Sequence, residues 1–183
     1  EQLARFARLA ERFEGVARHV ANSAAGLRFP DSRWDAVRAG IAIYGLSPFG
    51  DDPGAHGLEP VLSWRSFVAH TKTLAPGEST GYGRRFVADR PTRIGLVPVG
   101  YADGFRRGLT GTEVLVDGTR RRVVGTVSMD SFAVELGDES VGARVTLIGD
   151  GVLAEDHARV LGTINYEITT GIRCAAERAD RRA

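Results

Sequence analysis

The sequence has little of what several classes of protein require. Its one cysteine, Cys174, cannot form an intramolecular disulfide or a thiolate zinc site, which favours a reducing, cytoplasmic setting. No apolar run reaches the roughly 20 residues of a membrane-spanning helix, and no charged-then-apolar leader opens the chain, so we expect no membrane attachment. The 24 basic and 23 acidic residues leave a net charge of +1, so no nucleic-acid partner is indicated.

Metal ligands, lysine and methionine are also scarce. The four histidines show no metal-binding spacing, and no serine-hydrolase or Walker motif occurs. Lys72 is the single lysine, so any lysine chemistry uses that residue or comes from elsewhere. The single methionine is Met129, and the 183-residue chain begins at Glu1 inside an expected helix. We therefore expect a fragment, too short to contain a whole catalytic barrel.

The first 57 residues have the rhythm of an α/β fold. Apolar residues at steps of three and four predict a helix over 2–15. Short apolar runs predict buried strands over 16–21 and 39–46, with one helical turn over 34–37 between them. Such alternation is typical of an α/β barrel or a doubly wound sheet.

A second domain is expected to follow a loop over 47–57, which is rich in proline, glycine and aspartate. We therefore predict domains over 1–57 and 58–183. In the second, turn signals at Pro76-Gly77 and Asp117-Gly118 separate short β-type runs, including 113–116, 120–127, 132–136 and 144–148. This pattern predicts a mainly antiparallel β domain, with one helix over 155–161.

Several glycine-flanked positions could carry chemistry. Arg38 just before Gly40 could hold an anion, as could Asn22-Ser23 at a strand end, although surface arginines and loop caps look the same. Tyr82 lies between two glycines, which would leave its phenol free to project, or its ring could pack on a sheet rim. Tyr101 before Asp103-Gly104 could flank a hairpin turn, and Tyr166 could lie at a helix end.

Taken together and in order, six segments resemble the alanine racemase family. They are His19-Val20-Ala21-Asn22-Ser23, Arg38-Ala39-Gly40-Ile41-Ala42-Ile43-Tyr44-Gly45-Leu46, Gly81-Tyr82-Gly83, Val99-Gly100-Tyr101-Ala102-Asp103-Gly104, Ser128-Met129-Asp130 and Thr163-Ile164-Asn165-Tyr166-Glu167. The resemblance covers nearly the whole chain but only about the second half of that family's length. It implies the end of a (β/α)8 barrel followed by the family's antiparallel β domain.

The resemblance also implies a cofactor, pyridoxal 5′-phosphate, carried on a lysine that has no counterpart here. The residues that match the family's phosphate-binding positions are Ser23, Tyr166 and, through their backbone amides, Gly40 and Ile41. Arg38 would face the pyridine nitrogen. Because a guanidinium donates a hydrogen bond without readily surrendering a proton, the ring nitrogen would stay unprotonated, which disfavours side reactions such as transamination.

By the same resemblance, Tyr82 would be the catalytic base on one face of the substrate, opposite the missing lysine. A phenol serves as a base near neutral pH only with positive charge nearby. His19 and Asn22 would contact the site residues without touching the cofactor or the substrate. Met129 would contact the substrate carboxylate through its backbone, while Tyr101 and Arg107 would line the entrance. The family is homodimeric, with the β domain of one subunit covering the barrel of its partner.

These implications predict a racemase that interconverts L- and D-alanine for peptidoglycan synthesis. Two departures qualify the prediction for the isolated chain. Lys72 belongs to an expected β-domain strand, so the chain alone should not racemise alanine. The residues from Arg173 to Arg178 also differ from the family's usual final strand. A non-catalytic lid or dimerisation module, and a racemase for serine or another small amino acid, remain alternatives.

Overall fold

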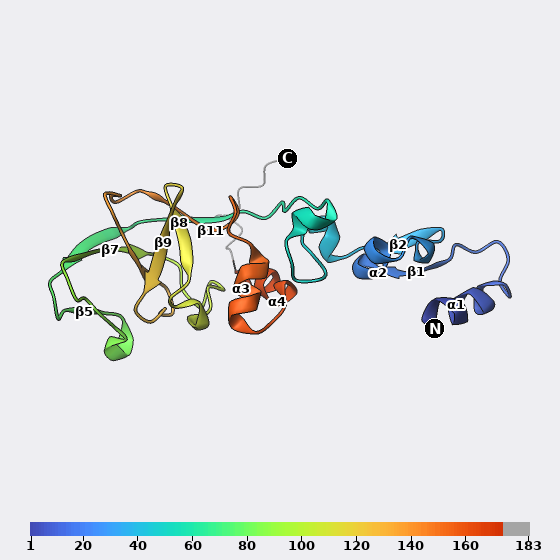
Figure 1. The fold of residues 1–183 in the computed structure, drawn as a ribbon, viewed down its shortest axis with the longest axis horizontal. Helices are drawn as coiled ribbons and strands as arrows, with labels where there is room; N and C mark the ends of the chain where they lie inside the picture. The colour runs from blue at the N-terminus through green and yellow to red at the C-terminus, as the bar shows by residue number, and fades with distance from the viewer. Residues whose placement is uncertain (174–183) are drawn as a thin grey trace. The chain divides into compact units, whose positions relative to one another are not determined.

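The computed structural model describes residues 1–173 and divides the chain into two compact units, one over Glu1–Val61 and one that begins at Leu62 (Figure 1). Cys174 and most of the divergent C-terminal segment lie outside the described residues. Within residues 1–173, no helix has the length and apolar character needed to cross a membrane.

The first unit is built around two parallel strands. Its elements are α1 (Gln2–Ala10), β1 (His19–Asn22), α2 (Ser23–Arg28), η1 (Pro30–Ser32), β2 (Ala36–Arg38), η2 (Ile41–Tyr44) and η3 (Pro53–His56), where η denotes a 3-10 helix. His19 lies beside Ala36, and Asn22 lies beside Arg38. The side chain of Asn22 accepts a hydrogen bond from the amide of Ala25 at 2.9 Å, which caps α2 directly after β1.

Three expectations for this unit were wrong. The first helix ends at Ala10, and residues 34–37 form a turn that enters β2. The Asp35 carboxylate accepts the amide of Arg18 at 2.8 Å, which draws this segment alongside the approach to β1. The apolar run over 39–46 is not a strand, because η2 turns its side chains to different sides: Ile41 is buried, whereas Ile43 and Tyr44 are exposed. Helix α2 was not expected at all.

The second unit contains the predicted antiparallel sheet. Its seven strands run in the order β3-β11-β8-β9-β10-β7-β4, and every neighbouring pair is antiparallel. Their bounds are β3 (Trp64–Phe67), β4 (His70–Leu74), β7 (Thr92–Val97), β8 (Glu113–Val116), β9 (Thr119–Val124), β10 (Phe132–Glu135) and β11 (Arg144–Ile148). A separate hairpin joins β5 (Ser79–Thr80) to β6 (Phe86–Val87).

The sheet curls strongly. Strands β3 and β4 stand at opposite ends of the strand order, yet only Val68 and Ala69 connect them. Two residues span less than about 10 Å, so the two ends of the sheet must approach each other. Val68, Phe105 and Phe132 belong to the core enclosed in this way, and the last two rings stack with centroids 4.5 Å apart.

Local signals located β8, β9, β10, β11 and α3, although β9 ends at Val124 and β7 was not predicted. The Asp117-Gly118 turn joins β8 to β9 with φ angles of 46° and 83°, as a primed hairpin turn requires. Helix α3 (Ala154–Leu161) agrees with the expected helix to one residue, and short η helices lie over Tyr82–Arg84 (η4) and Arg107–Leu109 (η5). Asn165 begins a further helix, α4 (Asn165–Gly171), where only a possible helix end was expected.

Candidate active site

The junction of β1 and α2 gathers polar groups of the first unit. The hydroxyl of Ser23 is the first side chain of α2, and it accepts hydrogen bonds from the amides of Gly40 at 2.8 Å and Ala42 at 3.4 Å. Ser23 and Ile41 are buried, whereas nothing lies within 4 Å of the position that a Cβ on Gly40 would occupy. The structure therefore brings Ser23 and the start of η2 together across 17 residues.

Arg38 ends β2, and it contacts the strand beside it. Its Nη1 lies 3.1 Å from Nδ1 of His19 and donates to the His19 carbonyl at 3.3 Å. Both side chains are exposed, so the guanidinium keeps donors available on its other nitrogens. The parallel pairing of β1 and β2 explains why two residues 19 positions apart meet here.

Tyr82 lies in the second unit, on the loop between β5 and β6, where it begins η4. Its side chain is 75% exposed, and its phenol makes no hydrogen bond within the described part of the chain. Thr126, which sequence reasoning missed, donates its hydroxyl to the Tyr82 carbonyl at 2.7 Å. No local pattern could have paired these residues, because 44 positions separate them.

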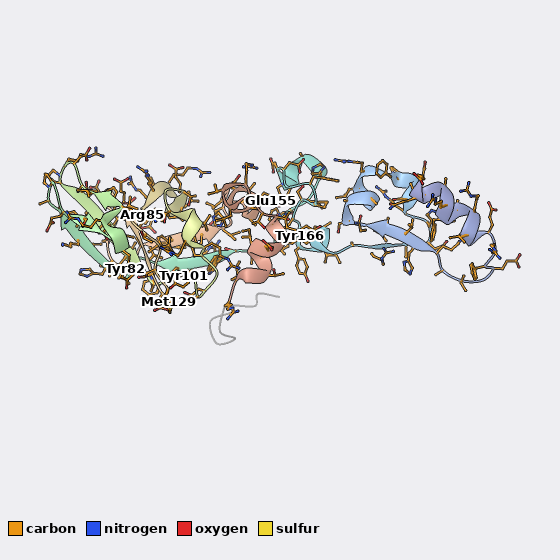
Figure 2. All side chains as sticks on the ribbon, turned by 90° about the horizontal axis from the view of Figure 1, so that it is seen from below. Tyr82, Arg85, Tyr101, Met129, Glu155 and Tyr166 are labelled. Atoms are coloured by element: carbon orange, nitrogen blue, oxygen red, sulfur yellow. The ribbon has the colours of Figure 1, made fainter. Side chains whose placement is uncertain are left out.

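The loops of Tyr101 and Met129 are joined through their backbones. The amide of Tyr101 donates to the Ser128 carbonyl at 3.0 Å, and the amide of Ala102 donates to the Met129 carbonyl at 3.0 Å. Asp103 accepts the amide of Gly100 at 2.9 Å, which closes the loop on itself. Tyr82, Tyr101 and Met129 lie along one margin of this unit in the view of Figure 2.

Two hollows extend along this unit. One of about 410 Å³ is lined by Tyr82, Thr126 and Ser128, among others. The other, of about 910 Å³, lies between the Tyr101 loop and α4. Tyr166, in the first turn of α4, is partly exposed, and Arg107 is exposed at the start of η5.

The polar groups of the first unit fit the phosphate and the pyridine nitrogen of pyridoxal phosphate, but they include no lysine for its aldehyde. A hydroxyl and backbone amides at an open glycine suit a phosphate group, and a guanidinium suits the pyridine nitrogen, which accepts a hydrogen bond. The aldehyde needs a lysine, but Lys72 lies on β4 with its ammonium 3.8 Å from the Glu78 carboxylate. No cluster of three potential metal ligands occurs within residues 1–173.

Solved structures define the class of protein to which this chain belongs. The solved structures that resemble this chain share its curled antiparallel domain and the α/β segment before it. One, an alanine racemase from E. faecalis, has a TM-score of 0.86 and 39% identity over 94% of this chain and 48% of that one. Another, from Bartonella henselae, was solved with covalently bound pyridoxal phosphate and has a TM-score of 0.83 and 32% identity over 94% of this chain and 49% of that one.

Sequence comparisons then define the family. Models of the alanine racemase N-terminal and C-terminal domains match residues 1–48 and 61–180. The alanine racemase of Nitrosomonas europaea is 46% identical over 178 residues, 94% of this chain and 49% of the relative. The chain belongs to the alanine racemase family, which confirms the resemblance of the six segments. It spans about half the length of the curated relatives it matches.

Proposed function

We propose that this chain is the C-terminal part of an alanine racemase that interconverts L- and D-alanine with pyridoxal phosphate. Residues 1–57 would be the end of the cofactor-binding barrel, and residues 58–183 would be the β domain. The observation that carries the proposal is the agreement with both racemase domain models in a chain that keeps an exposed tyrosine on a pinned loop. The racemase from Bartonella henselae supports the choice of cofactor.

The cofactor would be held at two points, its phosphate and its pyridine nitrogen. Ser23, the amides of Gly40 and Ile41, and Tyr166 of the second unit would bind the phosphate. The Gly40 amide donates to the Ser23 hydroxyl at 2.8 Å, which supports the assignment by placing the two groups side by side. On phosphate binding the amide would donate to the phosphate in place of the hydroxyl. Arg38 would donate a hydrogen bond to the pyridine nitrogen, and its contact with His19 would fix the guanidinium in orientation. Asn22 would support Ser23 by capping α2.

The second unit would supply the acid-base group. When bound, pyridoxal phosphate withdraws electrons from the α-carbon of the amino acid, which makes its proton removable. The phenol oxygen of Tyr82 would take that proton from L-alanine and return it in the reverse direction. Because a carboxylate only accepts hydrogen bonds, the contribution of Met129 would come from its amide. Tyr101 and Arg107 would line the entrance.

The complete protein would act as a cytoplasmic homodimer, in which the cofactor lysine lies outside the present chain and the β domain covers the partner's barrel. The D-alanine formed would serve peptidoglycan synthesis. The pairing of Lys72 with Glu78 on a β-domain strand supports the expectation that this chain alone is inactive.

Replacing Tyr82 with phenylalanine in the complete protein tests the proposal. A general base contributes about 10²- to 10⁴-fold, so solvent exchange of the L-alanine α-proton should fall at least about 100-fold while exchange from D-alanine survives. Both exchanges are measured by NMR in deuterated buffer. Tyr44→Phe, at an exposed tyrosine of the first unit, is the matched control. Equal exchange from both enantiomers in the Tyr82 variant would remove Tyr82 from the reaction.

A further inference from the structure

The exposed ring of Tyr82 depends on its backbone for its position. The phenol makes no hydrogen bond within residues 1–173, and the side chain is largely surrounded by solvent. The residues after it, Gly83 and Arg84, both have positive φ, at 73° and 48°. A group with so few side-chain contacts can be held in one place only through the main chain on which it stands.

Within residues 1–173, one side-chain hydrogen bond joins that main chain to the curled sheet. The Thr126 hydroxyl donates to the Tyr82 carbonyl at 2.7 Å, a normal length for such a bond. Thr126 is only 6% exposed, so its own position is well defined. It follows β9 by two residues, and Val127 beyond it is fully buried in the core.

The two backbones also pack directly against each other. Gly81 has φ of 76°, and a Cβ on it would lie 2.6 Å from the amide nitrogen of Thr126. Gly125 has φ of 68°, and a Cβ on it would lie 2.7 Å from the carbonyl oxygen of Thr80. Because real Cβ atoms do not approach backbone atoms so closely, only glycine fits at either position. Close backbone packing at Gly81 and at Gly125 therefore holds the Tyr82 loop against the end of β9.

We propose that Thr126 is a positioning residue for Tyr82, and that it acts with Gly81 and Gly125 as a clasp between the β5–β6 loop and the end of β9. The proposal rests on the proposed function, because the clasp affects the reaction only if Tyr82 exchanges a proton with the substrate. Thr126 touches no reacting atom. Its hydroxyl sets where the phenol oxygen stands.

The clasp should matter for rate more than for binding. Proton transfer requires the phenol oxygen within hydrogen-bond reach of the α-carbon proton, and a displacement of about 1 Å can cost about 100-fold. Loss of the Thr126 hydroxyl frees the Tyr82 carbonyl and widens the range of loop positions. The cofactor contacts proposed for the first unit do not involve this loop.

The test uses three variants of the complete holoenzyme. Thr126→Val removes the hydroxyl while keeping the side-chain shape, and Thr126→Ser keeps the hydroxyl. Thr92→Val is the matched control, because the Thr92 hydroxyl donates to the Arg90 carbonyl at 2.8 Å and Thr92 is 8% exposed. It lies on β7, outside the proposed site.

We expect Thr126→Val to slow α-proton exchange from L-alanine about tenfold, while exchange from D-alanine and KM stay within about twofold of the wild type. Thr126→Ser should restore exchange to within about twofold. Amide hydrogen exchange of the peptide over 79–87, measured without substrate, should accelerate about threefold or more in Thr126→Val only. Thr92→Val should change none of these quantities.

Two failures are distinguishable when Tyr82→Phe is measured in parallel. If Tyr82→Phe slows exchange from L-alanine but Thr126→Val does not, or if Thr126→Val slows both enantiomers equally, the positioning role is overturned while the proposed function stands. If Tyr82→Phe leaves exchange from L-alanine unchanged, the role of Tyr82 is overturned and the positioning role falls with it.

Discussion

At the scale of single residues, His157 is a polar group in apolar surroundings. Its side chain is 3% exposed on α3, its ring meets Phe105 edge-on with centroids 5.9 Å apart, and its Nε2 has no hydrogen-bond partner within residues 1–173. Burial lowers the pKa of His157 to about 4, although the charge of Asp156 acts in the opposite direction. The folded chain therefore holds this imidazole neutral.

This pKa predicts an acid-sensitive stability. The unfolded chain takes up the proton near pH 6.5 and the folded chain only near pH 4, so stability is complete above pH 6.5 and declines as the pH falls through that interval. The loss approaches about 3 kcal/mol. We expect His157→Phe to flatten the decline, whereas His70→Gln, at an exposed histidine of β4, should not. Urea unfolding at pH 7.5 and pH 4.5, followed by tryptophan fluorescence, measures the free energy of unfolding at each pH. Equal declines in all three chains would contradict the prediction.

At the scale of elements, the Glu139 carboxylate joins the segment that follows β10 to the neighbouring strand β9. Glu139 accepts hydrogen bonds from Nε of Arg121 on β9 and from the amide of Gly137, each at 2.7 Å. Arg93 on β7 donates to the Gly137 carbonyl at 2.9 Å. Burial alone would raise the pKa of Glu139, but the hydrogen bonds from Arg121 and from backbone amides hold it below its usual range.

Replacing Glu139 with alanine should therefore destabilise the sheet. Hydrogen bonds to a charged group that is largely screened from water contribute about 1.5–3 kcal/mol each, so we expect a loss of at least about 2 kcal/mol in the free energy of unfolding at pH 7. Because the folded pKa is lowered, this contribution is present above the unfolded value and disappears as the pH falls through the folded value. Glu113→Ala, which breaks an exposed 3.7 Å pair with Arg120, should cost less than about 1 kcal/mol. Equal losses in the two variants, measured by urea unfolding, would refute the stabilising role of the Glu139 hydrogen bonds.

What the sequence could predict depended on how local each signal was. The hairpin at Asp117-Gly118 was predicted because its turn residues are neighbours in the chain, and helix α3 was predicted to within one residue. The apolar run over 39–46 misled, because hydrophobicity without a period does not separate a strand from a turn of 3-10 helix. The contact of Thr126 with Tyr82 could not be predicted from the sequence, because only the folded sheet brings the two residues together. The roles of the site residues remain predictions from family resemblance.

At the scale of the whole molecule, the first unit exposes surfaces that folded chains usually bury. Its two strands are parallel, and parallel strands are normally covered on both faces, yet every residue of β2 is exposed. Ile43 and Tyr44 on η2 and Phe13 after α1 are exposed as well. Exposed apolar side chains of this kind promote association.

We therefore expect the isolated 183-residue chain to associate through its first unit. Light scattering coupled to gel filtration should give a mass above 19.7 kDa that rises over about a hundredfold range of concentration, because association follows mass action. Ile43→Glu should lower that mass, since a carboxylate resists burial in an apolar contact. Leu96→Glu, at a half-exposed leucine of β7 in the second unit, should leave it unchanged. A constant mass of 19.7 kDa at every concentration, or a response to Leu96→Glu alone, would show that the exposed surface of the first unit does not drive association.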